Sequence, residues 1–323
     1  MTKKENAKDL SMDILSIGTE ILTKDVMDQF LRSLGGIKTY YASKLSVALE
    51  TYREKNISIV FCEHQFQDGT VQSFINRIGG VDVSEPRYFI VASKDASPEL
   101  EALRKELNIH EVLLKPFSTE DVLGIVTRAI ERIQKKPEDW LYDLRICREA
   151  YQAKRFNEAE QFFKGYIKKY GNHGAALLEA VEYFLINNKL DVVEELLERI
   201  LLTEPNSARA LGMLGILHKK KGNIPLGLQY LRDAHAISPL NSARSYEMAE
   251  AEIILAEDQL RKSIEHDPFS SANHVMYIKL LVNRGQFTKA IKHMETKREF
   301  FGEEDKKEAE IYVSLAKKLA GLK

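Results

Sequence analysis

Three adjacent side chains that could do chemistry close an apolar run of the sequence. Cys62, Glu63 and His64 follow "ISIVF" (57–61) and supply a thiol, a carboxylate and an imidazole. A thiol needs a base and an orienting group to act as a nucleophile. Cys62 alternates inward with Val60, because residues two apart on a strand share one face. We therefore expect Cys62 to fill a core, which leaves Glu63 as the candidate for chemistry.

The elements around Glu63 alternate between strand and helix patterns. Strand-like runs stand at 13–17, 39–43, 57–62, 87–93 and 111–115, with amphipathic stretches at 21–34, 44–56, 69–78, 97–108 and 118–134. This alternation predicts a parallel sheet covered by helices on both faces. We expect a flavodoxin-like doubly wound (βα)5 domain over 12–134, after a flexible N-terminal tail of residues 1–11. In such folds, ligands bind beyond the carboxyl ends of the strands.

The stretch "LLKPFSTEDVLGIV" (113–126) carries a resemblance to a known family. A strand that ends in Lys-Pro-Phe, then a helix cap and an amphipathic helix, resembles the end of a CheY-like response-regulator receiver domain. The resemblance implies that an Asp at the end of the third strand accepts a phosphoryl group. It also implies an acidic pair that holds Mg²⁺, a hydroxyl residue that ends the fourth strand, and a lysine, because a phosphoryl dianion needs cations around it.

Most of these groups are replaced in this sequence. The corresponding residues form a degenerate phosphoacceptor pocket, which consists of Gly18, Thr19, Glu20, Glu63, Ala92, Ser93 and Lys115. Neither residue at the acidic pair is a carboxylate, the acceptor is the longer Glu63, and only Lys115 matches outright. We expect Mg²⁺ binding and phosphoryl transfer to be lost, and we expect no metal and no cofactor.

Glu63 leaves two interpretations open. In the first, its carboxylate imitates a phosphorylated Asp, pairs with Lys115 and holds the domain in an active-like state. In the second, the two side chains form a solvated ion pair at the sheet edge, worth about 0–1 kcal/mol. We favour the second, because "EHQFQDG" (63–69) is shorter than the family's loop and lacks its proline.

A repeat of fixed length begins after a linker at residues 135–139. "RFNEAEQFF", "KLDVVEELL" and "NIPLGLQYL" start at 155, 189 and 223, each 34 residues after the last. A helix hairpin of this length with a turn proline resembles the tetratricopeptide (TPR) repeat. We expect an α-helical TPR solenoid over 140–323, with about five hairpins and a closing helix. The fourth hairpin should be shortened, because only 29 residues separate Pro239 from Pro268.

Such a solenoid offers a concave groove to a peptide or a partner helix. By the family's register, the groove residues are Arg148, Tyr151, Gln152, Glu182, Leu185, Ile186, Arg209, Ile216, Lys219, Lys220, Lys279, Val282 and Asn283. Their apolar and basic mixture predicts an acidic, amphipathic protein or peptide partner. The lysines of "HKKKG" (218–222) fit a solvated hairpin tip better than a nucleic-acid patch. By resemblance, residues 97–134 could also form a homodimer face.

Composition limits the function further. Lys and Arg number 47 against 48 Asp and Glu, so no global basic field attracts nucleic acid or a membrane surface. No apolar run approaches the roughly 20 residues of a membrane span. The start, "MTKKENAKDLS", lacks the apolar segment of a secretory signal, so we expect a cytoplasmic protein.

The function that these observations predict is a non-enzymatic signalling adaptor in a bacterial regulatory pathway. The receiver would act without phosphorylation, and the TPR groove would bind a protein. No set of nucleophile, base and orienting group points to an enzyme. The alternative is a phosphorelay response regulator whose phosphorylation switches partner binding by the TPR array.

Overall fold

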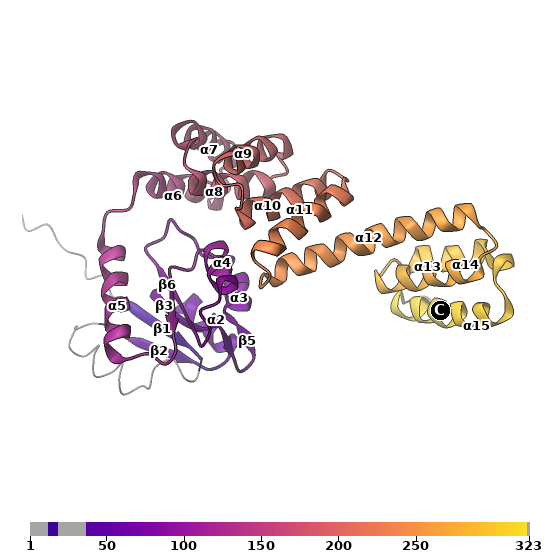
Figure 1. Ribbon diagram of the computed structural model, residues 1–323, viewed down its shortest axis with the longest axis horizontal. Helices are drawn as coiled ribbons and strands as arrows, with labels where there is room; N and C mark the ends of the chain where they lie inside the picture. Colours follow the sequence, from indigo (N-terminus) through magenta and orange to yellow (C-terminus); the bar gives the residue numbers. More distant parts are fainter. Residues whose placement is uncertain (1–11, 19–36, 322–323) are drawn as a thin grey trace, which may run out of the picture. The chain divides into compact units, whose positions relative to one another are not determined.

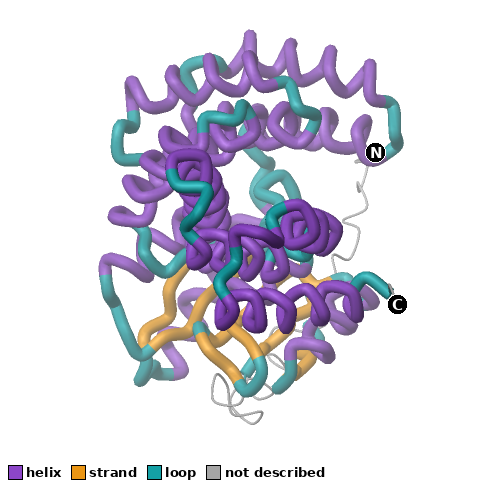
Figure 2. The backbone as a smooth tube through the Cα atoms, turned by 90° about the vertical axis from the view of Figure 1, so that its right-hand side faces the viewer, coloured by secondary structure: helices purple, strands orange, loops and turns teal. Residues whose placement is uncertain are grey.

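The computed structural model describes residues 12–18 and 37–321 (Figure 1). The chain divides into two compact units. Unit 1 contains residues up to Leu217 and residues 230–245, and unit 2 contains residues 218–229 and the chain from Tyr246 onward. The described strands, orange in Figure 2, all precede residue 115, and the chain beyond them is helical. Within the described ranges, no helix is both long and apolar enough to cross a membrane.

A five-stranded parallel sheet organises the first part of unit 1. Its order is β2-β1-β3-β6-β7, which is a doubly wound order. The strands are β1 (Asp13–Ile17), β2 (Thr39–Ala42), β3 (Ile57–Glu63), β6 (Tyr88–Ser93) and β7 (Glu111–Leu114). The helices are α2 (Leu45–Glu54), α3 (Val71–Arg77), α4 (Pro98–Glu106) and α5 (Thr119–Gln134). The predicted doubly wound fold is confirmed, and the helix expected at 21–34 lies outside the described residues.

Two hydrophobic cores cover the two faces of this sheet. Successive residues of a strand point to opposite faces, and neighbours such as Val60 and Phe61 therefore enter different cores. Phe61 packs with α5 on one side, whereas Val60 and Cys62 pack with α2 and α3 on the other (Figure 1). The burial of both faces explains the nearly continuous apolar runs of the sequence.

Helix hairpins form the rest of the chain. They are α6 (Asp139–Gln152) with α7 (Phe156–Tyr170), α8 (Gly174–Ile186) with α9 (Leu190–Thr203), α10 (Ala208–Lys220) with α11 (Ile224–Ile237), and α13 (Ser271–Asn283) with α14 (Phe287–Thr296). A single helix, α15 (Glu303–Leu319), follows. The first three hairpins turn on left-handed residues that keep the 34-residue spacing of the sequence: Lys154, Asn188 and Gly222.

The three turns also share one hydrogen-bond pattern. The amide of the residue after each left-handed position donates to the carbonyl oxygen five residues earlier. For example, the Arg155 amide donates to Ala150 at 3.0 Å, and the Lys189 amide donates to Phe184 at 2.9 Å. This pattern satisfies the free carbonyl groups at a helix end. The predicted helical repeat is therefore present in successive hairpins.

One continuous helix stands where the sequence predicts a shortened fourth hairpin. α12 runs over Ser242–His266, 25 residues, without a turn. A turn of the kind described above needs a residue that adopts a left-handed conformation, usually Gly or Asn. The α12 segment contains neither of these, and no Pro. The expectation of a shortened hairpin is therefore wrong, and one uninterrupted helix fills the interval between Pro239 and Pro268.

Candidate functional site

Four strands bring the predicted pocket residues to the carboxyl edge of the sheet. Gly18 follows β1, Glu63 ends β3 and Lys115 follows β7. Glu63 pairs in register with Ala92 of β6, whose last residue is Ser93. A pocket of about 470 Å³ opens here, lined by Glu63, His64, Gln65, Phe66, Ala92, Ser93, Lys94, Asp95 and Lys115.

Glu63 and Lys115 form an ion pair in this pocket. The Lys115 Nζ donates to the Glu63 Oε1 at 2.6 Å. Only 8% of the Glu63 side chain and 14% of the Lys115 side chain are exposed, so the pair is more buried than the solvated pair we expected. Removal of one partner from a buried pair costs about 3 kcal/mol, because the other charge stays desolvated. The lysine thus fixes the position of the carboxylate at the end of β3.

Gly18 explains how a glutamate fits at this place. Its φ of 117° lies in the region that favours glycine. A Cβ atom at residue 18 would stand 2.5 Å from the Glu63 Oε2, so any other side chain there would force the Glu63 carboxylate to move. The carboxylate of Glu63 occupies the space that an acidic residue at position 18 would need. Thr19 and Glu20, the other residues predicted on this side, lie outside the described residues.

The neighbours of Glu63 do not form a nucleophile and base. Cys62 is buried in the core between the sheet and α2 and α3, and burial raises the pKa of its thiol well above the usual range. Its Sγ donates to the Glu63 carbonyl oxygen at 3.3 Å. Burial lowers the pKa of His64, although the nearby Asp95 opposes the shift. A thiol that stays protonated is a poor nucleophile, so Cys62 is a core residue.

A small hairpin that the sequence did not predict follows Glu63. It consists of β4 (Gln65–Phe66) and β5 (Gly69–Thr70). The Asp68 Oδ1 accepts from the Leu45 amide at 2.7 Å, which ties the hairpin to the first residue of α2. The Thr70 side chain accepts from the Ser73 amide at 3.1 Å and so caps α3. These contacts tie the loop after Glu63 to the first residues of α2 and α3.

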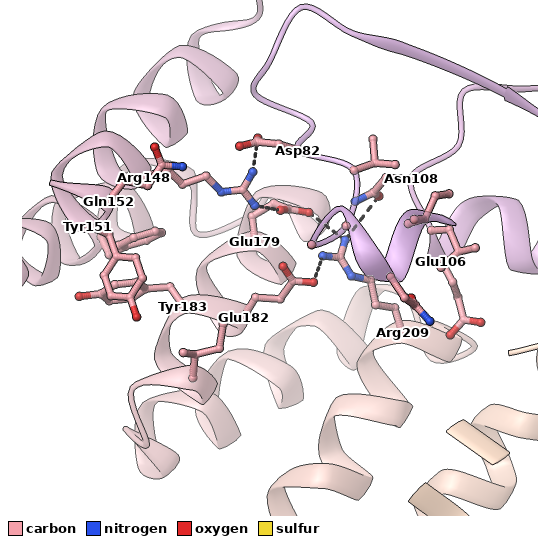
Figure 3. Close-up of a pocket in the computed structure, with 18 of the residues that line it drawn as sticks. Asp82, Glu106, Asn108, Arg148, Tyr151, Gln152, Glu179, Glu182, Tyr183 and Arg209 are labelled. Carbon is pink, nitrogen blue, oxygen red and sulfur yellow. Dashed lines mark hydrogen bonds and ion pairs between the residues drawn. The ribbon is translucent and has the colours of Figure 1, made fainter. Parts of the chain in front are cut away.

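A second pocket lies between the α/β domain and the helical array of unit 1 (Figure 3). It has a volume of about 450 Å³. Six predicted groove residues line it: Arg148, Tyr151, Gln152, Glu182, Ile186 and Arg209. Residues 79–82 and 106–108 of the α/β domain form the facing wall. The chain's own loops therefore form one wall of this part of the groove.

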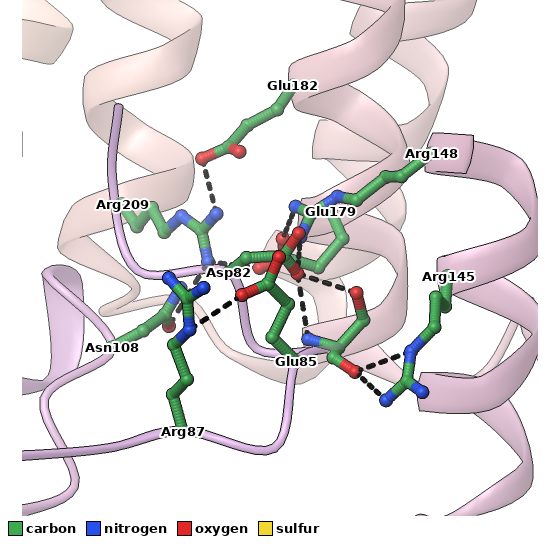
Figure 4. A network of polar contacts seen from close by, with 10 residues as sticks. Asp82, Glu85, Arg87, Asn108, Arg145, Arg148, Glu179, Glu182 and Arg209 are labelled. Atoms are coloured by element: carbon green, nitrogen blue, oxygen red, sulfur yellow. Dashed lines mark hydrogen bonds and ion pairs between the residues drawn. The ribbon is translucent and has the colours of Figure 1, made fainter. Parts of the chain in front are cut away.

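Alternating charges cross the first helices of the array (Figure 4). Glu179 of α8 bridges Arg148 of α6 at 2.6 Å and Arg209 of α10 at 2.8 Å. Arg148 also pairs with Asp82 of the α/β domain, and Arg209 pairs with Glu182. Burial acts to lower the pKa of Arg209, but these carboxylates outweigh it and raise the pKa. The ladder joins two arginines to three carboxylates and holds Asp82 against the array.

A second polar contact joins the α/β domain to the start of α12. The Glu106 carboxylate accepts from the Ser238 hydroxyl at 2.6 Å and pairs with Arg244, whose side chain is 4% exposed. The Gln72 side chain donates to the Asn241 Oδ1 at 3.1 Å and accepts from the Ser242 amide at 3.2 Å. Residues of the α/β domain thus satisfy free groups at the N-terminus of α12.

The remaining predicted groove residues have other surroundings. Leu185 is buried, and Ile216 packs against the helical core of unit 1. Lys219 and Lys279, both in unit 2, form ion pairs of 2.7 and 2.6 Å with glutamates of the same unit. Unit 2 also contains Lys220, Val282 and Asn283. Of the predicted groove residues, the structure gathers the six named above at one pocket.

Comparisons with known proteins find no matching family model and no matching curated protein. Solved structures do match. The chemotaxis response regulator CheY4 of Vibrio cholerae is 17% identical, with a TM-score of 0.33, over 36% of this chain and 98% of that chain. The protein MamA is 17% identical, with a TM-score of 0.34, over 50% of this chain and 91% of that one. The pilF protein of Pseudomonas aeruginosa is 14% identical, with a TM-score of 0.33, over 56% and 92%.

Because these TM-scores are below 0.5, we base the assignment on the strand order of the sheet and the turns that recur every 34 residues. The chain joins a receiver-like domain to TPR-like hairpins. The pocket of Glu63 and Lys115 thus lies at the carboxyl edge of the receiver-like sheet. The second lies between receiver-like loops and the first helices of the TPR-like array.

Sequence reasoning missed the receiver-like side of the second pocket. Asp82 and Glu106 stand in loop and helix-end positions with no pattern that sets them apart. Two signals on the array side were available. Glu179 interrupts the apolar run "AALLEAVEYFL" (175–185), and Arg244 lies five residues after the turn proline Pro239. A charged residue at a position that the repeat buries needs a partner. Glu179 finds its partners within the array, whereas the partner of Arg244 is Glu106 of the receiver-like domain.

Proposed function

We propose that the protein is a non-enzymatic signalling adaptor. The receiver-like domain keeps one conformation without phosphorylation, and the TPR-like array binds a protein partner. The ion pair of Glu63 with Lys115, packed over Gly18, carries the proposal. A phosphoryl group on Glu63 would lose this pairing geometry and would need space for three more oxygen atoms where the carboxylate already fills the gap.

The geometry also supports the first interpretation of Glu63. Its carboxylate contacts the lysine at 2.6 Å, in a pocket that excludes most solvent from both side chains. This charge-assisted hydrogen bond is permanent, and it would replace the contact that the lysine makes with a phosphoryl group in a phosphorylated receiver. The tied hairpin after Glu63 is consistent with a loop that stays in one state. The domain then serves as a constant surface for protein contacts.

The decisive experiment is incubation of the full chain with acetyl phosphate and Mg²⁺, followed by intact-mass measurement. We expect no increase by the mass of one phosphoryl group, while a conventional receiver domain in the same reaction gains one. The matched variant is Glu63→Gln, which removes the only carboxylate at the end of β3. A stable adduct on the natural chain that disappears in Glu63→Gln would contradict the adaptor proposal and favour the phosphorelay alternative.

A further inference from the structure

A loop of the receiver-like domain lies on the TPR-like array in the manner of a bound peptide. The loop "GGVDVSEP" (79–86) joins α3 to β6. Asp82 pairs with Arg148 of α6, and the Arg145 Nε of the same helix donates to the Ser84 carbonyl oxygen at 3.1 Å (Figure 4). Val83 packs against the hydrophobic core of the array. The array therefore contacts an acid, an aliphatic side chain and a backbone carbonyl in succession.

The contacts between this loop and the array are specific, but they are weak enough for another segment to replace them. The side chains of Asp82 and Arg148 are 28% and 21% exposed, so their pair contributes on the order of 1 kcal/mol. Gly79 and Gly80 have φ values of 88° and 94°, and no atom lies within 4 Å of a Cβ placed on either. The chain at the two glycines thus has room to move, whereas Val81 is buried in the core between the sheet and α2 and α3 and anchors the loop to its own domain. An equivalent acidic segment could replace Asp82-Val83-Ser84 on the array, because it would restore the same contacts there.

The pocket next to Asp82 offers a partner contacts that the loop itself does not make. The pocket of about 450 Å³ extends from Arg148 along Tyr151 and Tyr183 (Figure 3). Ile186, at its rim, is 71% exposed. Aromatic and aliphatic groups that line a partly filled groove are the usual anchors of protein interfaces. A segment that carries an acid and continues with apolar residues would fill this space.

We propose that the partner binds α6 and α8 through an acidic–aliphatic segment that resembles Asp82-Val83-Ser84 and displaces this loop. The proposal rests on the proposed function, because it names the partner chemistry of the same array. Arg148 receives the partner's carboxylate, Arg145 receives a backbone carbonyl, and the aliphatic side chain takes the place of Val83. The receiver-like domain is then an intramolecular competitor for the array's own ligand.

A labelled peptide with the sequence of residues 79–86 tests this directly by fluorescence anisotropy on the full chain. The natural chain should bind it weakly, because the tethered loop competes at an effective concentration in the millimolar range. Asp82→Arg places two positive charges together, expels the loop and leaves the array intact. We expect it to bind the peptide about tenfold more tightly or better. Glu85→Arg makes the same charge change on the same loop, away from Arg148, and should bind as the natural chain does.

A second variant separates loop release from site loss. Arg148→Glu also expels Asp82, but it replaces the guanidinium that receives the carboxylate, so it should not bind the peptide. A control peptide with Asn for Asp should bind no variant. Should Asp82→Arg fold poorly, Asp82→Asn releases the same contact with less disturbance and should shift affinity in the same direction.

Equal affinity of the natural chain and both Asp82 variants would overturn the proposal, as would tight binding by Arg148→Glu. This outcome is independent of the acetyl phosphate experiment. Loss of the peptide result would leave a phosphorylation-independent receiver standing, whereas a phosphoryl adduct would leave the peptide site standing.

Discussion

Gly18 and Glu63 share one space at the carboxyl edge of the sheet, and each limits what the other can be. The glycine adopts φ 117°, and the glutamate carboxylate stands 2.5 Å from the place of a Cβ. The pair with Lys115 holds the carboxylate there. At the scale of single residues, the absence of a side chain at Gly18 therefore matters to this pocket as much as the side chains of Glu63 and Lys115.

We expect Gly18→Ala to lower the free energy of unfolding by about 2 kcal/mol or more, through backbone strain and the clash with Glu63. Urea unfolding of the single variants and of the double variant with Glu63→Ala gives the coupling between the two sites. The loss from Gly18→Ala should be smaller in the Glu63→Ala background, because only the strain is left. Strictly additive effects would show that the two residues do not compete for space.

At the scale of elements, the hairpin turns carry the regularity of the array. Lys154, Asn188 and Gly222 occupy the same left-handed position. A lysine in this conformation is strained, because its Cβ lies too close to the following carbonyl oxygen, whereas glycine has no Cβ. The element tolerates this strain at one turn, since the helices on both sides pack into a common core.

Lys154→Gly should therefore raise the free energy of unfolding by about 0.5–1 kcal/mol, and Gly222→Ala should lower it by about 1 kcal/mol. Thermal unfolding followed by circular dichroism measures both. Lys164→Gly, in the middle of α7, is the matched control and should destabilise, because its position is helical. Destabilisation by Lys154→Gly would mean that the lysine side chain, and not the backbone, decides this turn.

The turn before β7 makes stability depend on pH through His110. Its Nδ1 accepts from the Phe89 amide at 3.1 Å, and its ring stacks on Tyr88 with centroids 4.4 Å apart. Burial, with Arg132 and Arg104 nearby, lowers the pKa of His110 from 6.5 to about 3. Between these values the unfolded chain binds the proton and the folded chain does not, so stability falls as the pH falls.

Below pH 6.5 we expect His110 to remove about 1.4 kcal/mol of stability per pH unit. Urea unfolding at several values between pH 7 and pH 5 shows this slope before most carboxylates titrate. His110→Asn keeps an acceptor for the Phe89 amide and has no proton to gain, so its stability should change less with pH. The same slope in both proteins would assign the effect to other groups.

At the scale of unit 1, the receiver-like domain and the TPR-like array are joined by buried polar contacts. Glu106 of α4 and Arg244 of α12 are 7% and 4% exposed. The Arg244 Nη1 also donates to the Ala234 and Ser238 carbonyl oxygens, at 2.9 and 2.8 Å. One guanidinium thus links the end of α11, the start of α12 and the receiver-like domain.

Glu106→Gln should weaken this link by about 3 kcal/mol, because Arg244 stays buried without its counter-charge. Hydrogen exchange followed by mass spectrometry should show faster exchange in residues 238–245 and unchanged exchange in α7. Glu101→Gln, on the exposed face of the same helix, is the matched control. Identical exchange in Glu106→Gln and the natural chain would show that the link does not hold α12.

The sequence predicts the elements far better than the contacts between them. The strands are recoverable because sheets buried on both faces need apolar runs, and the hairpins because their turns recur at a fixed interval. The β4–β5 hairpin escapes prediction, since strands of two residues have no period. The contacts of Asp82 and Glu106 escape too, because a single acid on a loop carries no sign of its partner. Glu63 and Lys115 could be predicted together because the fold places the carboxyl ends of β3 and β7 at the same edge of the sheet, with β6 between them.

The shared space of Gly18 and Glu63 also limits how the pocket can be redesigned. An acid at position 18 would have to displace the Glu63 carboxylate, which fills its place. A shorter acid at position 63 would give up the present contact with Lys115. A metal-binding pocket therefore cannot be built here one substitution at a time without loss of stability, and a designer would have to change both positions together.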